Sequence, residues 1–200
     1  MKKTILSMLL VVIAVGASAQ TLYGYYTNRA DKSKTRYRVE YITNGLKNKP
    51  YVLVEVMGEA DKNYLMIDID NIKSAQDGFK EMKEKYIEWV KIARENNVTE
   101  VDKKMDYPFH GRIGAAWRNS QWWFSTGFCY NMQPYFKIKG ISKTVTFAQA
   151  IRSDSNKYIE NTLYIKFTSV QDFDSLINIL DDGKLGAKIK GVKSKENLFK

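Results

Sequence analysis

Hydrophobic and polar residues alternate along much of the chain, which is the pattern of strands with one buried face. In 35–42, for example, Tyr37, Val39 and Tyr41 occupy every second position between charged residues. Residues 21–34 are mainly polar and indicate a loop or a weak first strand. The alternation predicts strands at the following positions: 35–42, 51–57, 64–69, 113–117, 121–130, 134–141, 144–151 and 158–167.

The period changes between Ser74 and about Asn96, where apolar residues recur at spacings of three and four. This spacing predicts one long helix with a buried stripe. Ser74, followed three residues later by Asp77, predicts a capped first turn. The stripe consists of Phe79, Met82, Tyr86, Trp89, Val90 and Ala93.

A second, shorter helix is expected at 169–180, with Ser169 and Asp172 as its capping pair. Gly183 suits the left-handed position that ends a helix, so we expect the helical structure to stop there. The beginnings of the two predicted helices share the pattern S-x-Q-D. Either a duplication of two halves, 35–97 and 111–181, or convergence on common capping chemistry explains this likeness.

Strands that outnumber helices and come in consecutive runs predict the α+β class. The expected architecture is a largely antiparallel, twisted sheet of about seven to nine strands, on which one long and one short helix pack. The two halves would then be related strand–strand–helix units. Residues 20–183 are expected to form a single globular domain.

The N-terminal segment 1–19 has the layout of a secretory signal peptide. A cationic start precedes an apolar run from Ile5 to Val15, and 17–19 is a small-residue A-x-A cleavage site. No cysteine stands at the expected cleavage point directly after that run, so the pattern does not fit a lipoprotein. We therefore expect an exported protein, periplasmic or secreted, with no transmembrane segment in the mature chain.

Charge is concentrated at the C-terminal end. Residues 184–200 hold six lysines and one acid, so they carry +5 of the chain's net charge of +10. The composition predicts a basic tail that contacts an anionic envelope surface rather than nucleic acid, or one that only keeps the protein soluble. The lysines expected to make such contact are Lys184, Lys188, Lys190, Lys193 and Lys195.

Aromatic residues are concentrated between 117 and 136. Trp122 and Trp123 are adjacent in a predicted strand and so belong to opposite faces, one of which points away from the core unless both faces are covered. An exposed tryptophan outside the cell is suited to sugar stacking, lipid contact or a protein interface. The predicted ligand-binding residues are Trp117, Trp122, Trp123 and Tyr130.

No motif of nucleophilic, metal-dependent or phosphate-binding catalysis occurs in the chain. His110 and Cys129 are the only residues of their types and carry no catalytic pattern around them. The cluster of Asp68, Asp70 and Asn71 lacks the later ligands of a calcium loop and also suits a helix start. We predict no catalytic residue, metal or cofactor.

These observations favour a non-enzymatic binding module that recognises a protein or glycan through its aromatic strands. Two alternatives stay open at this point. A curved sheet closed by a helix could enclose the cavity of a lipid or small-molecule carrier. A hydrolase could use two carboxylates that only the fold brings together.

Overall fold

A computed structural model describes residues 20–43, 49–106, 112–118, 121–125, 133–152, 158 and 160–197. The expected signal peptide, 1–19, lies outside these residues. The helices and strands follow in chain order: β1(Thr21–Thr27), β2(Arg36–Ile42), β3(Tyr51–Gly58), β4(Lys62–Asp68), the 3-10 turn η2(Ile69–Asn71), α1(Ile72–Glu95), β5(Glu100–Lys104), β6(Arg112–Arg118), β7(Gln121–Ser125), β8(Gln133–Lys139), β9(Ser142–Arg152), β10(Glu160–Phe167), α2(Val170–Ile179) and α3(Asp182–Asn197).

The strands form one antiparallel sheet with two sections. The six-stranded section runs in the order β1-β2-β3-β4-β6-β7, and the four-stranded section runs β5-β8-β9-β10. Antiparallel pairing between β10 and β3 joins the sections. The predicted α+β class, with a largely antiparallel sheet and one long and one shorter helix packed on it, is confirmed.

The joint between the sections is narrow. In the described part of the chain, β10 pairs with β3 at two positions, Leu163 with Gly58 and Tyr164 with Met57. The Glu59 amide extends this contact by donating to the carbonyl oxygen of Thr162 at 3.2 Å. Asn161 donates a hydrogen bond across the joint to Asn63 at 2.8 Å, between two buried side chains. These contacts hold the two sections at one point rather than along a full strand.

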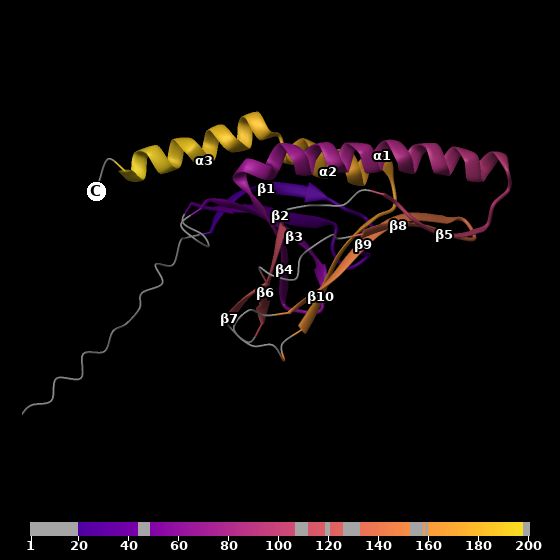
Figure 1. The fold of residues 1–200 in the computed structure, drawn as a ribbon, viewed down its shortest axis with the longest axis horizontal. Coiled ribbons are helices and arrows are strands. Elements are labelled where there is room, and N and C mark those ends of the chain that lie inside the picture. The colour runs from indigo at the N-terminus through magenta and orange to yellow at the C-terminus, as the bar shows by residue number, and fades with distance from the viewer. Residues whose placement is uncertain are drawn as a thin grey trace, which may run out of the picture.

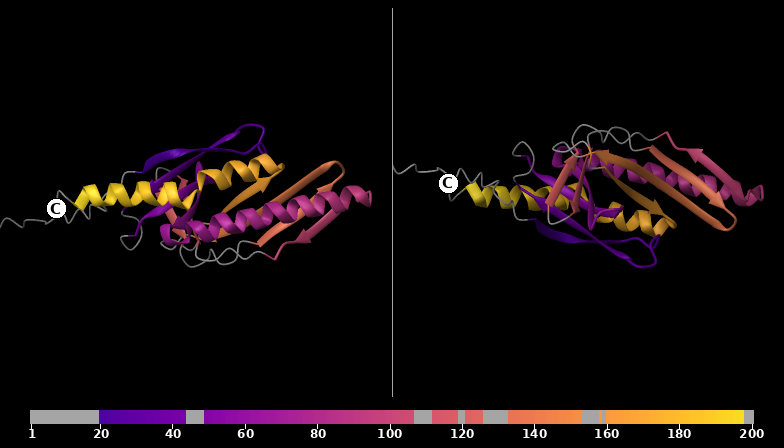
Figure 2. Two further views of the ribbon diagram at one scale, coloured as in Figure 1. Left: turned by 90° about the horizontal axis from the view of Figure 1, so that it is seen from above. Right: turned by 90° about the horizontal axis from the view of Figure 1, so that it is seen from below.

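All three helices lie along the same side of the sheet (Figure 1). The views from above and below show α1 and α2 side by side, with α3 continuing beyond the sheet (Figure 2). Helix α1 covers the four-stranded section, where Phe79 packs against Phe147 and Phe167 at centroid distances of 6.0 and 5.9 Å. The buried stripe predicted for the long helix therefore faces the sheet at Phe79.

Helix α2 packs on this core through Phe173. The ring of Phe173 stacks on Phe167 at 3.9 Å and contacts Tyr86 at 5.7 Å. The Tyr86 hydroxyl donates to the carbonyl oxygen of Thr168 at 3.1 Å. Burial, with a smaller contribution from Asp172, raises the pKa of Tyr86.

The cap predicted for the second helix is confirmed, and the cap predicted for the first is wrong. Ser169 and Asp172 form a reciprocal capping box at the start of α2. Helix α1 instead begins at Ile72, because Asp68 caps the preceding turn η2 and the chain is already helical when it reaches Ser74. The shared S-x-Q-D pattern therefore marks different positions in the two helices, and the duplication stays a prediction.

Two further expectations are corrected by elements that sequence periodicity missed. The connector after α1 contains a strand, β5. The expected helix stop at Gly183 is wrong, and 184–197 of the predicted basic tail belong to α3, which starts at Asp182. The physical reason is that Leu185 and Ile189, one turn apart, are both buried, so the basic segment packs as a helix.

Candidate functional site

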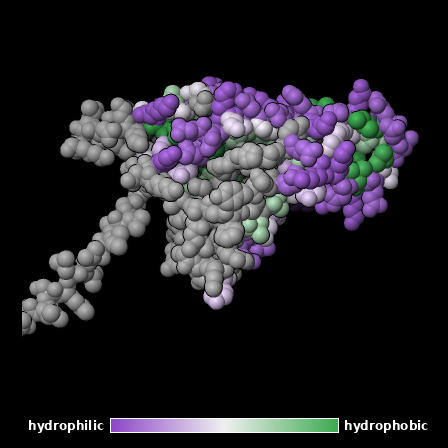
Figure 3. All heavy atoms as spheres, viewed as in Figure 1, coloured by the Kyte–Doolittle hydropathy of each residue, from purple (hydrophilic) through white to green (hydrophobic). Residues whose placement is uncertain are grey.

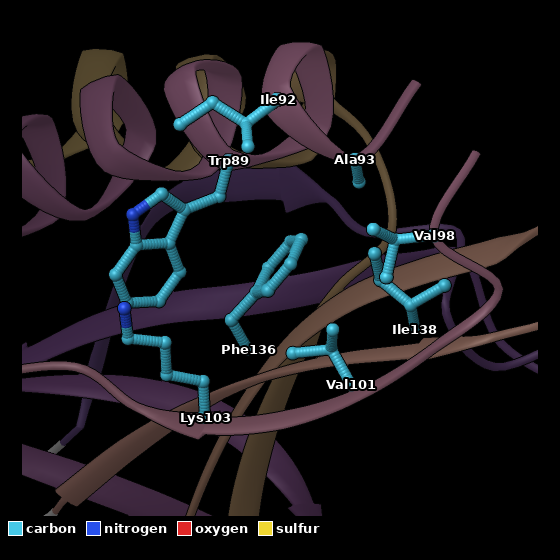
Figure 4. A pocket seen from close by; sticks show the side chains of 8 residues that line it. All are labelled: Trp89, Ile92, Ala93, Val98, Val101, Lys103, Phe136 and Ile138. Carbon is cyan, nitrogen blue, oxygen red and sulfur yellow. The ribbon is translucent and has the colours of Figure 1, made fainter. Parts of the chain in front are cut away.

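A groove opens beneath the C-terminal half of α1, between this helix and β5. We call it the Trp89 groove. Its eight lining side chains come from α1, the α1–β5 connection, β5 and β8 (Figure 4): Trp89, Ile92, Ala93, Val98, Val101, Lys103, Phe136 and Ile138.

The groove exists because the chain reverses sharply at the end of α1. Asn97 adopts a positive φ of 52°, a conformation that asparagine tolerates better than most residues. The Val98 amide then donates to the carbonyl oxygen of Ala93 at 2.8 Å. The turn brings β5 back beneath the helix, and β8 forms the floor because it pairs with β5.

Two lysines approach the tryptophan at one end of the groove. The Nζ atoms of Lys103 and Lys85 lie 4.5 and 5.6 Å from the Trp89 ring centroid. The ring also packs edge-on against Phe136 at 5.4 Å, which fixes its orientation. Trp89 therefore lies where the apolar lining of the groove borders its positively charged end.

The volume of the Trp89 groove is about 160 Å³. An apolar cavity of roughly 150 Å³ accommodates a benzene-sized molecule, whereas sites for drug-sized ligands occupy roughly 300–1,000 Å³. The Trp89 groove therefore fits one aromatic or branched aliphatic side chain.

The surface around the groove is positively charged. Residues 85–104 and 137–143 together contain eight Lys or Arg residues and four acids. Figure 3 shows hydrophobic atoms at this end of the molecule, framed by hydrophilic ones. The adjacent β8–β9 hairpin tip adds Ile141, whose exposed fraction is 98%. This end of the protein combines exposed apolar area with a basic border.

A second, wider groove of about 450 Å³ lies on the other flank of α1. It has more polar lining than the Trp89 groove, with Lys91 and Glu95 forming a loose ion pair at 3.9 Å. Its apolar residues include Ile87, whose exposed fraction of 45% is close to the 46% of Ile92 on the opposite flank. The two isoleucines therefore offer matched positions for testing each groove separately.

A buried pair of carboxylates on β2 and β3 is the feature closest to the hydrolase alternative. Glu55 accepts hydrogen bonds from Lys34 and from the Arg38 amide, and Glu40 accepts one from the Arg38 guanidinium at 3.2 Å. Burial, followed by Glu40 and Glu55, raises the pKa of Tyr64 well above its usual value. Lys34 and Arg38 therefore pair with the two carboxylates, and the hydrolase alternative stays a prediction.

For the predicted aromatic site, the structure describes the backbone pairing of the three tryptophans. Trp117 of β6 pairs directly with Trp122 of β7, and Ala116 pairs with Trp123. Tyr130 lies outside the described residues, as do His110 and Cys129. The role of these tryptophans in binding stays a prediction.

The lysines of the predicted tail lie on α3 or beyond it. Lys188 approaches the ring of Tyr23 in β1, with its Nζ 5.1 Å from the centroid. Deleting the segment would also remove the buried Leu185 and Ile189, so substitution is the better test of surface contact. Lys193 and Lys195 belong to the same helix.

Replacing Lys184, Lys188 and Lys190 by glutamine is expected to weaken binding to vesicles that contain anionic phospholipid. Each lysine near such a surface contributes about 1 kcal/mol, and the contribution falls as salt screens it. Cosedimentation at low and high salt measures the loss. The matched triple replacement of Lys32, Lys62 and Lys166 should reduce binding much less, and equal losses would contradict a specific role for α3.

The acidic cluster at the end of β4 serves local structure. Asp68 accepts a hydrogen bond from the Asp70 amide at 3.0 Å and lies 3.6 Å from Lys49. No group of three or more metal-binding side chains gathers anywhere in the described part of the chain. Within that part there is also no helix of the length and hydrophobicity needed to cross a membrane.

Sequence reasoning placed Trp89 in the core and did not find the groove. The signal was present in Ile92, which lies beside the predicted stripe rather than in it. Apolar residues outside the buried stripe of an amphipathic helix indicate a second contact surface.

The chain was compared with family models, with curated proteins and with solved structures, and none of the three comparisons finds a match.

Proposed function

We propose that the protein is an exported, non-enzymatic binding module that recognises another protein through the Trp89 groove. The observation that carries the proposal is an open apolar groove, sized for one side chain, with a positive end. Export is inferred from the signal-peptide layout of residues 1–19.

The lining of the groove favours a protein over a glycan or a lipid. Seven of its eight side chains are apolar or aromatic, and the eighth is Lys103. Sugar hydroxyls need several directed polar partners, which this groove does not provide. An acyl chain needs more room than about 160 Å³. A single apolar anchor with acidic neighbours matches both the apolar lining and the positive end.

The test is selection of peptides from a random display library, followed by affinity measurement with two matched variants. Ile92→Asp places a carboxylate in the groove and is expected to weaken binding at least about tenfold. Ile87→Asp makes the same change on the other flank of α1 and should leave affinity within about twofold.

Both isoleucines are about half exposed, so either variant should fold. Fluorescence polarisation with labelled peptides gives the affinities, and thermal melting checks the fold. Equal losses in the two variants would overturn the proposal. Selection of no peptide, together with binding on a glycan array, would move the function to the glycan alternative.

A further inference from the structure

We infer that the partner binds as an added β-strand on the outer edge of β5, inserting an apolar side chain into the Trp89 groove and an acidic side chain beside Lys103. This inference rests on the proposed function and names the partner's chemistry: an extended segment with the pattern acid–any–apolar.

The outer edge of β5 is open. This strand ends the strand order of the sheet, and no other described strand pairs with its outer side. The carbonyl oxygen of Thr99 accepts from Gly140 and the amide of Met105 donates to Pro134, both at 2.9 Å, so these residues face β8. Backbone direction alternates along an antiparallel strand. The residues whose amides and carbonyls face outward are therefore Glu100, Asp102 and Lys104.

The strand with the open edge, β5, also contributes side chains to the Trp89 groove. Val101 and Lys103 of β5 both line the groove, two residues apart, and so share one face of the strand. A segment added antiparallel to β5 would place alternate side chains on that same face. The residue opposite Val101 would enter the groove, and the residue two positions earlier in the partner would lie opposite Lys103. Strand addition next to a side-chain pocket is a general way of recognising extended peptides.

The charges select the partner. Lysines on an edge strand discourage unselective pairing, and here Lys103 and Lys85 stand together at the Trp89 end of the groove. Lys85 is already paired with Glu88 at 2.7 Å, so an acidic residue at that position would pair with Lys103. Hydrogen bonds from the partner's backbone supply affinity that does not depend on its sequence. The acidic residue and the apolar anchor supply specificity.

A second copy of the chain fits this edge poorly. Outward-facing residues must pair with outward-facing residues. No antiparallel register of β5 with a second β5 that obeys this rule sets an acid opposite Lys103, because Glu100 and Asp102 face outward whereas Lys103 faces β8. A second copy therefore lacks the acid–any–apolar pattern that the groove and Lys103 select. The occupant is therefore a different sequence.

The experiment uses the peptides selected on the full mature chain. Each peptide position is N-methylated in turn, and affinity is measured by fluorescence polarisation. Strand addition predicts losses of about tenfold or more at alternate positions and tolerance at the positions between them. Asp102→Pro, which removes an outward amide and blocks the edge, should cause a similar loss.

Charge variants test the selected pattern separately. Lys103→Glu should remove the preference for an acid at the position before the anchor, whereas Lys104→Glu, on the opposite face, should keep it. Tolerance of every N-methyl group and of Asp102→Pro, with Ile92→Asp still abolishing binding, would overturn strand addition and leave the proposed function intact. A dimer that Asp102→Pro dissociates in sedimentation would overturn it in favour of a second copy.

Discussion

Asp172→Ala is expected to lower the free energy of unfolding by about 3–5 kcal/mol. The carboxylate is almost fully buried, with an exposed fraction of 1%. It accepts hydrogen bonds from the Arg29 amide at 3.0 Å, from the Ser169 amide at 3.0 Å, and from the amide and hydroxyl of Thr168 at 3.0 and 2.8 Å. Alanine removes the acceptor of three backbone amides whose hydrogen bonds are partly buried.

The loss is large because these bonds connect separate elements. Arg29 follows β1, whereas Thr168 and Ser169 link β10 to α2. One carboxylate therefore holds the start of α2 against both sections of the sheet. Asp172→Asn keeps one acceptor oxygen and should lose an intermediate amount of stability.

Asp174→Ala is the matched control, two residues along the same helix. The Asp174 side chain is 45% exposed and pairs with Lys83 at 2.9 Å. Exposed pairs contribute about 0–1 kcal/mol. Urea unfolding followed by circular dichroism measures both variants, and a cost below about 1 kcal/mol for Asp172→Ala would show that the network is not structural.

The second large effect is expected at the joint between the sheet sections. A Cβ atom on Gly58 would lie 2.4 Å from the Asn63 side chain and 2.7 Å from the carbonyl oxygen of Thr162. Neither neighbour yields easily, because Thr162 contributes backbone and Asn63 is hydrogen-bonded to Asn161. Gly58→Ala should therefore cost about 3 kcal/mol through overpacking and lost hydrogen bonds.

Gly191→Ala makes the same chemical change where nothing lies within 4 Å of the new methyl group. This position is inside α3, where alanine is favoured over glycine by up to about 1 kcal/mol. In urea unfolding, Gly58→Ala is expected to lower the free energy of unfolding, whereas Gly191→Ala is expected to raise it. A neutral Gly58→Ala would contradict close packing at the joint, because the added methyl group would then be accommodated without loss of the neighbouring contacts.

Periodicity was sufficient to predict the elements in which apolar residues recur at regular intervals. It found β2, β3, β4, β8, β9, β10 and the stripe of α1, although β3 and β4 prove to be buried on both faces. It missed β5, since four of its five residues are exposed and only Val101 is apolar. It missed α3 because lysines and glycines are frequent throughout this segment, and its buried apolar side chains in the described part, Leu185 and Ile189, are too few to show a helical period.

The candidate site was harder to predict for a related reason. A residue on a helix stripe is read as core, and Trp89 is on the stripe. Only the length of α1 relative to the strands beneath it decides that Trp89 borders an opening rather than the interior. That relation depends on where β5 and β8 lie, which is tertiary information. Pairing of Trp117 with Trp122 also needed the hairpin register.

The order of the strands also bears on how the chain reaches this structure. Synthesis proceeds from the N-terminus, so β1 to β4, β6 and β7 are all made before β10. Until β10 arrives, the end of β3 at Met57 and Gly58 lacks its neighbour. Pairing across about a hundred residues is entropically costly and slow compared with local hairpins. Closure of the β3–β10 joint is therefore expected to be a late step of folding. An incomplete nascent chain would carry the six-stranded section with the end of β3 not yet paired to β10.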